Sequence, residues 1–292
     1  MINFMKYRWL YFLISAVIIL PGIYHLIRFG LVPAIDFTGG TLLELRINSE
    51  ELKIDEEKIR EVAGKNEVEV ATIQTTNQNS VILRMKPLES GIKEKLMASF
   101  SGVLGEVEEV RYESVGPTLG KELLNKTFIA AILATLAILS YVAYAFKNIR
   151  YGTAAVLALL HDLLVVVGTF AILGKYLGVE VDALFVTAVL TTMSFSVHDT
   201  IVVFDRIRET QKKKSNQPFE NMINQALTET MTRSLNNSLT IIFMLLALFL
   251  MGGETTKWFV LALLIGIISG TYSSPFVATP ILYTWHVLRR RD

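Results

Sequence analysis

Residues 183–208 read ALFVTAVLTTMSFSVHDTIVVFDRIR, and this stretch decides how the chain folds. From Ala183 to Phe204 the side chains are apolar or hydroxyl-bearing, apart from one histidine and one acid, Asp199. A helix needs about 20 mostly apolar residues to cross a bilayer. A basic cluster begins at Arg206, and such clusters mark the cytoplasmic ends of membrane spans. The stretch therefore predicts a transmembrane helix with an acid roughly 10 Å inside its cytoplasmic end, at about 1.5 Å per residue.

Five further stretches have a similar apolar character. The chain has 292 residues, of which 52% are hydrophobic and 19% charged, whereas a soluble domain is about a quarter charged. The six predicted spans are Trp9–Ile27, Phe128–Phe146, Gly152–Leu173, Ala183–Phe204, Leu239–Met251 with a polar lead-in, and Trp258–Trp285. The last is longer than a minimal span, so it is expected to tilt or to extend beyond the bilayer. The first lacks a small-residue cleavage pattern and is predicted to be an uncleaved anchor.

The charged residues divide between the two sides of the predicted membrane. Residues 30–122 contain 17 acidic and 11 basic residues, a net charge of −6, and the other residues contain 10 acidic and 17 basic, a net charge of +7. With six spans, all basic clusters fall on one side: Lys6/Arg8, Lys147/Arg150, Arg206–Lys214 and Arg289–Arg291. Because cytoplasmic loops carry the excess of Lys and Arg, both termini are predicted to be cytoplasmic. Because the basic clusters are short and lie at the ends of apolar runs, the sequence disfavours nucleic-acid binding.

The order of predicted strands and helices in the acidic segment is typical of a small α+β domain. The predicted strands are Thr41–Ile47, Val68–Thr75, Val81–Lys86 and Val107–Val115, and the predicted helices are Asp55–Gly64 and Glu89–Leu104. Asn77–Asn79 indicates a hairpin turn between the second and third strands. The order β-α-β-β-α-β is that of a ferredoxin-like domain. An irregular acidic loop is the alternative.

The sequence as a whole predicts a polytopic α-helical membrane protein with six transmembrane helices and one extracytoplasmic ferredoxin-like α+β domain. The first helix falls in residues 1–29, the outer domain with its flanking junctions in 30–122, and the other five helices in 123–292. The predicted location is the cytoplasmic membrane.

The motifs of several enzyme classes are missing from the sequence. There is no cysteine, which excludes disulfides and thiolate metal sites. There is no H-E-x-x-H zinc motif, no G-x-S-x-G nucleophile motif and no G-x-x-x-x-G-K-[ST] phosphate loop. No set of His, Asp and Glu has the spacing of metal ligands. The sequence predicts neither an enzyme nor a resident cofactor or metal.

Ionisable residues inside the predicted spans are the candidate functional residues. An intramembrane carboxylate is costly and by default marks an ion or proton pathway, which makes Asp199 the first candidate. A carboxylate locked by an interhelical hydrogen bond, without a transport role, is the alternative. His161 and Asp162 lie deep in the third span and fit a buried structural pair as well as a proton relay. His198 is more typical of a helix-packing donor than of an ion ligand.

Two groups of glycines have positions that indicate a structural purpose. Those that flank the outer domain suit hinges or tight turns, and they are Gly39, Gly40, Gly116 and Gly120. Gly266 and Gly270 lie four residues apart in the last span, which allows another helix to approach closely.

Four local sequences are unusual for a generic membrane protein: DFTGG at 36–40, VGPTLGKEL at 115–123, SVHDTIVVFDRIRE at 196–209 and GTYSSPF at 270–276. Together they resemble the SecF family of protein-export membrane subunits, and the resemblance covers essentially the whole chain. His198 departs from the asparagine that the family more often has before the Asp-Thr pair.

The resemblance implies a function as well as a fold. It implies that the chain is half of a resistance–nodulation–division type assembly. Such a chain would pair with SecD and with the channel of SecY, SecE and SecG, and it would contact membrane lipid. It would use the proton-motive force to promote translocation of exported polypeptides. The resemblance also implies that Arg233 acts with Asp199 by stabilising its ionised form, whereas the residues alone fit a snorkelling arginine equally well. A small-molecule exporter subunit and a passive scaffold are the alternatives. Both H⁺ and Na⁺ fit the sequence as the coupling ion.

Overall fold

The computed structural model describes residues 3–47, 56–75, 80–88, 91–146, 148–213 and 217–289. The chain divides into two compact units. Met1–Val32 and Ile129–Asp292 form one unit, which we call the helical bundle, and Pro33–Phe128 form the other, which we call the α+β domain. The sequence placed the outer segment at 30–122, so the boundaries differ by a few residues at each end.

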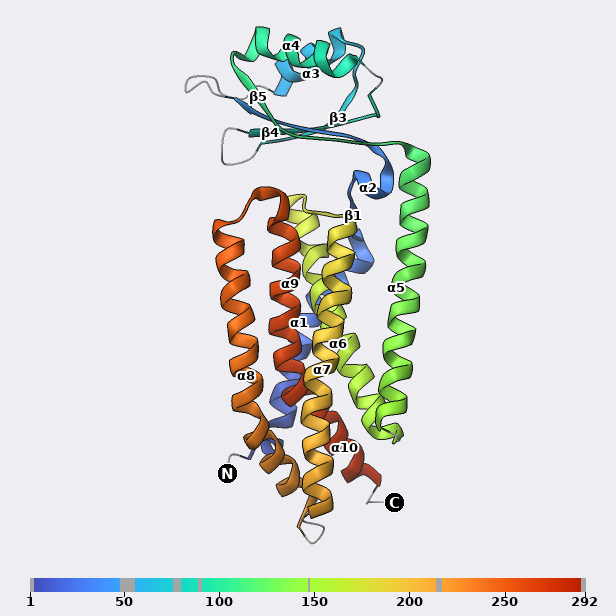
Figure 1. The fold of residues 1–292 in the computed structure, drawn as a ribbon, viewed down its shortest axis with the longest axis vertical. Coiled ribbons are helices and arrows are strands. Elements are labelled where there is room, and N and C mark those ends of the chain that lie inside the picture. Colours follow the sequence, from blue (N-terminus) through green and yellow to red (C-terminus); the bar gives the residue numbers. More distant parts are fainter. Residues whose placement is uncertain are drawn as a thin grey trace. The chain divides into compact units, whose positions relative to one another are not determined.

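Long helices make up the bundle (Figure 1). They are α1 (Arg8–Phe29), preceded by the 3₁₀ turn η1 (Met5–Tyr7), most of α5 (Pro117–Phe146), α6 (Ile149–Leu177), α7 (Ala183–Lys213), α8 (Phe219–Met251), and the consecutive α9 (Glu254–Ser273), η2 (Ser274–Ala278) and α10 (Thr279–Arg289). Within the described residues, 6 helical segments are long and apolar enough to cross a membrane. The predicted fold class is therefore confirmed.

The helices extend beyond the predicted spans because their polar ends remain helical. α8 begins at Phe219, well before the apolar run at Leu239, and α5 begins at Pro117, well before Phe128. Proline suits the first position of a helix, where its missing N–H would have no partner anyway. The basic positions Lys147, Lys214, Arg290 and Arg291 lie outside the described residues.

The last predicted span is one continuous helical segment with a π turn in it. η2 is a π turn that contains Pro275, which has no N–H to donate to the preceding turn. The hydroxyl of Thr279 donates to the carbonyl oxygen of Ser274 over 2.9 Å. Single π turns inside α-helices often mark functional positions.

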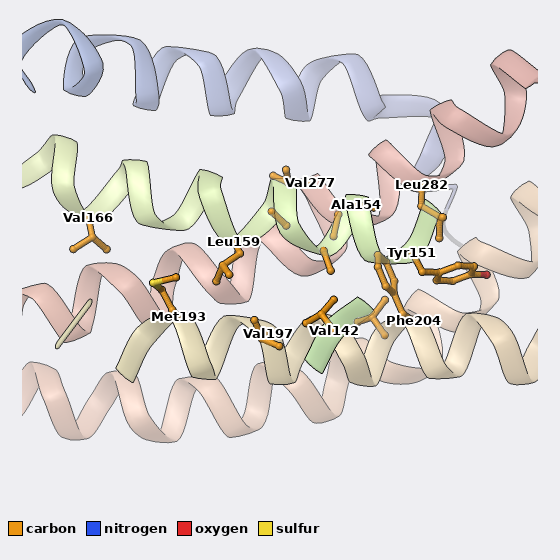
Figure 2. Close-up of a cluster of buried hydrophobic side chains, with 14 of the residues drawn as sticks. Val142, Tyr151, Ala154, Leu159, Val166, Met193, Val197, Phe204, Val277 and Leu282 are labelled. Atoms are coloured by element: carbon orange, nitrogen blue, oxygen red, sulfur yellow. The ribbon is translucent and has the colours of Figure 1, made fainter. Parts of the chain in front are cut away.

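The bundle core lies among α6, α7 and the last helical segment. Leu159 of α6, Val197 of α7 and Val277 of η2 point into the same apolar cluster (Figure 2). At one end of this cluster the rings of Tyr151 and Phe204 meet edge to face, with centroids 5.3 Å apart. Because lipid tails are as apolar as these side chains, close packing rather than the hydrophobic effect holds such helices together.

Two glycines bring α1 against α6 at backbone distance. An added Cβ atom on Gly22 would lie 2.8 Å from the Cα atom of Gly168, and one on Gly168 would lie 2.8 Å from the Cα atom of Gly22. Ser15 and Gly22 are the buried residues of α1 among those that the structure describes. The backbones of α1 and α6 therefore come closest at these two glycines, while the other side chains of α1 are at least partly exposed.

Both ends of the chain lie at the same end of the bundle (Figure 1). The guanidinium of Arg8 lies 5.0 Å from the ring centroid of Tyr283 in α10. The amide of Met5 donates to the side-chain oxygen of Asn224 in α8 over 3.2 Å. An even number of spans requires this arrangement.

The α+β domain contains a four-stranded antiparallel sheet. In chain order its elements are α2 (Ile35–Thr38), β2 (Gly40–Ile47), α3 (Glu56–Lys65), β3 (Val70–Thr75), β4 (Ser80–Met85), α4 (Ile92–Leu104) and β5 (Val107–Val115). The strand order is β3-β4-β2-β5, which is the ferredoxin-like arrangement that the sequence predicted. The two-residue strands β1 (Val32–Pro33) and β6 (Glu180–Val181) lie outside this sheet.

The two helices α3 and α4 cover one face of the sheet (Figure 1). Leu43, Leu83 and Phe100 are fully buried between the sheet and these helices. The predicted turn Asn77–Asn79 lies outside the described residues, but the strands on either side of it pair, with Thr75 opposite Val81. The hairpin that the turn was expected to form is thus present.

Candidate functional site

Two carboxylates are buried in the membrane part of the bundle. Asp162 in α6 and Asp199 in α7 each have a relative exposure of 4%. A buried charge is expensive unless polar partners surround it. The hydrogen-bond partners of the two acids differ.

Asp162 is surrounded by hydrogen-bond donors from three helices. Its Oδ1 atom accepts from Nδ1 of His161 at 2.9 Å and from the hydroxyl of Ser269 at 2.6 Å. Its Oδ2 atom accepts from the hydroxyls of Ser196 at 2.5 Å and Ser273 at 2.6 Å. We call these five residues the Asp162 hub; they join α6, α7 and α9 through a single carboxylate.

His161 extends the hub to α1. Its Nε2 atom lies 3.1 Å from the hydroxyl of Ser15. Because Nδ1–H donates to Asp162, Nε2 of a neutral ring accepts from that hydroxyl. The ring also stacks on Tyr272, with centroids 6.1 Å apart, and the Tyr272 hydroxyl donates to the carbonyl oxygen of Tyr11. The sequence grouped His161 with Asp162, and the structure places them in direct contact.

Asp199 has a much sparser environment. In the part of the chain that the structure describes, its side chain has one hydrogen bond, from the hydroxyl of Ser234 in α8 to Oδ2 at 3.2 Å. The next residue, Thr200, is buried and shares a hydrogen bond of 2.9 Å with the hydroxyl of Ser274 in η2. Asp199 therefore faces α8, and acceptor positions on its carboxylate remain open.

Arg233 and His198 are both exposed. His198 directly precedes Asp199 in the sequence, and Arg233 directly precedes Ser234, the residue that donates a hydrogen bond to Asp199. Among the described residues, Arg233 forms no ion pair with Asp199, and Ser234 is the neighbour of that acid in α8. In the described part of the chain, His198 is not among the hydrogen-bond partners of Asp162. The structure thus leaves both basic residues on the surface of the bundle.

Gly266 and Gly270 lie where α9 crosses α7. A Cβ atom added to Gly266 would come within 2.7 Å of three side-chain atoms of Thr192, and one on Gly270 would lie 3.1 Å from the Cβ atom of Ser196. The small residues therefore let α9 approach closely enough for Ser269 and Ser273 to reach Asp162.

Two of the junction glycines pack against each other within the α+β domain. Gly39 has a φ of 73°, which favours glycine, and a Cβ atom there would lie 2.7 Å from the Cα atom of Pro117. A Cβ atom on Gly120 would lie 2.8 Å from the backbone nitrogen of Gly39. Gly40 has a φ of 136°, and Gly116 has open space around it.

Four serines that complete the two sites were missed by sequence reasoning: Ser15, Ser234, Ser269 and Ser273. Serine is common in membrane helices, so a single one carries little signal. The spacing of Ser269 and Ser273, four residues apart in an apolar run, was the available clue, because such a pair lies on one helix face. In the described ranges, no group of three or more His, Asp and Glu side chains could hold a metal ion.

The comparisons with known proteins agree with this architecture. The sequence profile of a family described as "Protein export membrane protein SecD/SecF, C-terminal" matches residues 95–288. The chain is 47% identical to the protein translocase subunit SecF of Thermobaculum terrenum, over 98% of this chain and 94% of that protein. The chain belongs to the SecF family of protein translocase subunits. The SecF subunit of Anaerolinea thermophila is 39% identical, over 98% of this chain and 94% of that one.

A solved structure resembles the whole chain. It is SecDF of Thermus thermophilus, described as a translocon-associated membrane protein, with a TM-score of 0.86 and 30% identity. The match covers 98% of this chain but only 39% of the SecDF chain. This chain therefore corresponds to one part of a longer chain in that relative, and it is a multi-pass membrane protein of the SecF family.

Proposed function

We propose that this SecF-family chain pairs with a SecD subunit and couples the proton-motive force to the export of polypeptides through the SecY, SecE and SecG channel. Asp199 exchanges the coupling ion, and the α+β domain acts on the emerging polypeptide outside the membrane. The bundle lies in the cytoplasmic membrane among its lipids, with both termini in the cytoplasm.

The observation that carries the proposal is the environment of Asp199. Its carboxylate is buried within a membrane helix, has one hydrogen bond among the described residues, and lies one residue from the hydrogen bond between Thr200 and Ser274. Gain or loss of a proton there changes the charge that α7 presents to α8. One charge that crosses a potential of about 100 mV supplies about 2.3 kcal/mol, so a few protons per cycle can drive a conformational change.

Exposed polar residues in the membrane helices support a protein partner. On α7 they follow helical spacing and include Thr187, Thr191, Ser194 and His198. On α8 they include Thr232, Arg233, Asn236, Asn237 and Thr240. Ionisable side chains that face lipid are costly, so a second set of membrane helices is expected to cover Arg233 and His198. A SecD subunit fits because SecDF contains this fold as 39% of its chain. Within such a complex, Arg233 modulates the charge of Asp199.

The test is a transport assay on the assembled complex. The chain is expected to co-purify with a SecD partner from native membranes. Inverted membrane vesicles that contain both subunits should translocate a preprotein faster when a proton gradient is imposed, and vesicles without this chain should not respond. An equal response of both vesicle types to the gradient would refute the coupling function, and a sodium gradient that alone restores the rate would identify Na⁺ as the ion.

The orientation is tested by cysteine labelling, for which a chain without cysteine is well suited. Ala98→Cys, on the exposed side of α4, should react with a membrane-impermeant thiol reagent added from outside. Lys212→Cys, at the exposed end of α7, should react only after the cytoplasmic side is opened to the reagent. The reverse pattern would show that the termini lie outside.

A further inference from the structure

The Asp162 hub lies one helical turn from Asp199. Ser196, whose hydroxyl donates to Asp162, precedes Asp199 by three residues on α7, about 4.5 Å along the helix axis. Residues three apart lie on neighbouring parts of a helix surface. Any movement of α7 at the hub is therefore transmitted to Asp199.

The acceptor positions of Asp162 are occupied. An ionised carboxylate offers about four lone-pair positions, and four donors reach Asp162 over 2.5–2.9 Å. Hydrogen bonds to an ionised group are about twice as strong as neutral ones. A group that passes protons needs an acceptor position that opens and closes, and the geometry of Asp162 provides none.

A second link fixes α7 on the other side of Asp199. Ser273 donates to Asp162, and the next residue, Ser274, shares its hydrogen bond with Thr200 of α7. Ser273 ends α9 and Ser274 begins the π turn. Ser273 and Ser274 thus connect the hub to Thr200, which follows Asp199. Ser196 connects the hub to the helical turn that precedes Asp199.

We infer that Asp162 is a positioning residue for Asp199 and takes no part in ion exchange itself. Through Ser196 and Ser273 it holds α7 and α9 in the register that keeps Asp199 opposite Ser234 of α8. The inference rests on the proposed function of Asp199, but the position of that residue can be measured independently of transport.

The experiment uses cross-linking in the complex with the SecD partner. In the cysteine-free chain, the pair Asp199→Cys and Ser234→Cys is treated with a short bifunctional thiol reagent, with and without Asp162→Asn. We expect Asp162→Asn to lower the rate of cross-linking about tenfold. The control pair, Arg206→Cys and Glu229→Cys, joins the same two helices at an ion pair farther along, and its rate should not change.

A milder variant covers the case in which Asp162→Asn does not assemble. Ser196→Ala removes one of the four donors and should lower the rate at the Asp199 pair roughly threefold. Its matched control is Ser238→Ala in α8, because the Ser238 hydroxyl is fully buried and forms no hydrogen bond with the described residues. That variant should leave both rates unchanged.

The rate of translocation by the same variants distinguishes a positioning role of Asp162 from a role in a proton relay. Asp162→Asn should slow gradient-driven translocation but leave a response, since Asp199 is still present. An unchanged rate at the Asp199 pair, or an equal loss at both pairs, would overturn the inference. So would a complete loss of the gradient response with unchanged cross-linking, which would make Asp162 a relay member. If Asp199→Asn itself responds fully to the gradient, the proposed function fails while the cross-linking result stands.

Discussion

Replacement of Asp199 by asparagine is expected to abolish the response of export to the proton gradient while the complex stays assembled. Asparagine has nearly the same shape as aspartate, and its side-chain oxygen can still accept a hydrogen bond from the hydroxyl of Ser234. In the wild type that hydroxyl lies 3.2 Å from Oδ2 of Asp199. It cannot gain or lose a proton. The neutral side chain also removes a buried charge that costs about 3 kcal/mol or more in a membrane helix, so assembly should not suffer.

The measurement is the rate of preprotein translocation into vesicles, with and without an imposed gradient. The matched control is Asp205→Asn, which makes the same chemical change on the same helix. Asp205 is exposed, just beyond the apolar run of α7, and it pairs with Arg208 over 3.4 Å. An exposed ion pair contributes little to stability. The control should respond as the wild type does. A full response in Asp199→Asn vesicles would refute the coupling role.

The sequence was sufficient to predict the elements that hydrophobicity and charge dictate. The apolar run from Ala183 to Phe204, with its basic flank, gave the position of α7, and the strand Val107–Val115 was predicted with the bounds that β5 has. Strand order followed as well, because a β-α-β-β-α-β segment has few arrangements that bury one face of the sheet. These features depend on local pattern, which a sequence contains.

The partners of the buried acids could not be predicted, because they depend on which helix faces which. Ser196 precedes Asp199 by three residues, which places the two on neighbouring parts of α7, yet the hydroxyl of Ser196 donates to Asp162 in α6. Arg233 was expected beside Asp199, but the residue that reaches the acid is its neighbour, Ser234. One residue on a helix corresponds to a rotation of about 100°, and sequence spacing does not fix the rotation of one helix against another.

Gly168→Leu is expected to be the most damaging change in the bundle outside the acids. The backbones of α1 and α6 meet there, since even a single added carbon on Gly168 would lie 2.8 Å from the Cα atom of Gly22. Neither position can yield, because the obstacle is main chain rather than a flexible side chain. Leucine must push α1 away and with it Ser15, which hydrogen-bonds to His161 seven residues earlier on α6.

The expected result is a loss of about 3 kcal/mol or more from overpacking. At roughly 2–4 °C per kcal/mol for a chain of this size, the melting temperature in detergent should fall by about 6–12 °C. Gly102→Leu in α4 is the matched control, because nothing lies within 4 Å of an added Cβ atom there. Since glycine is a poor helix former, that control should be neutral or slightly more stable. If Gly168→Leu melts with the wild type, α1 is held by contacts other than the glycine crossing, such as the hydrogen bonds of Ser15 with His161 and of Tyr272 with Tyr11.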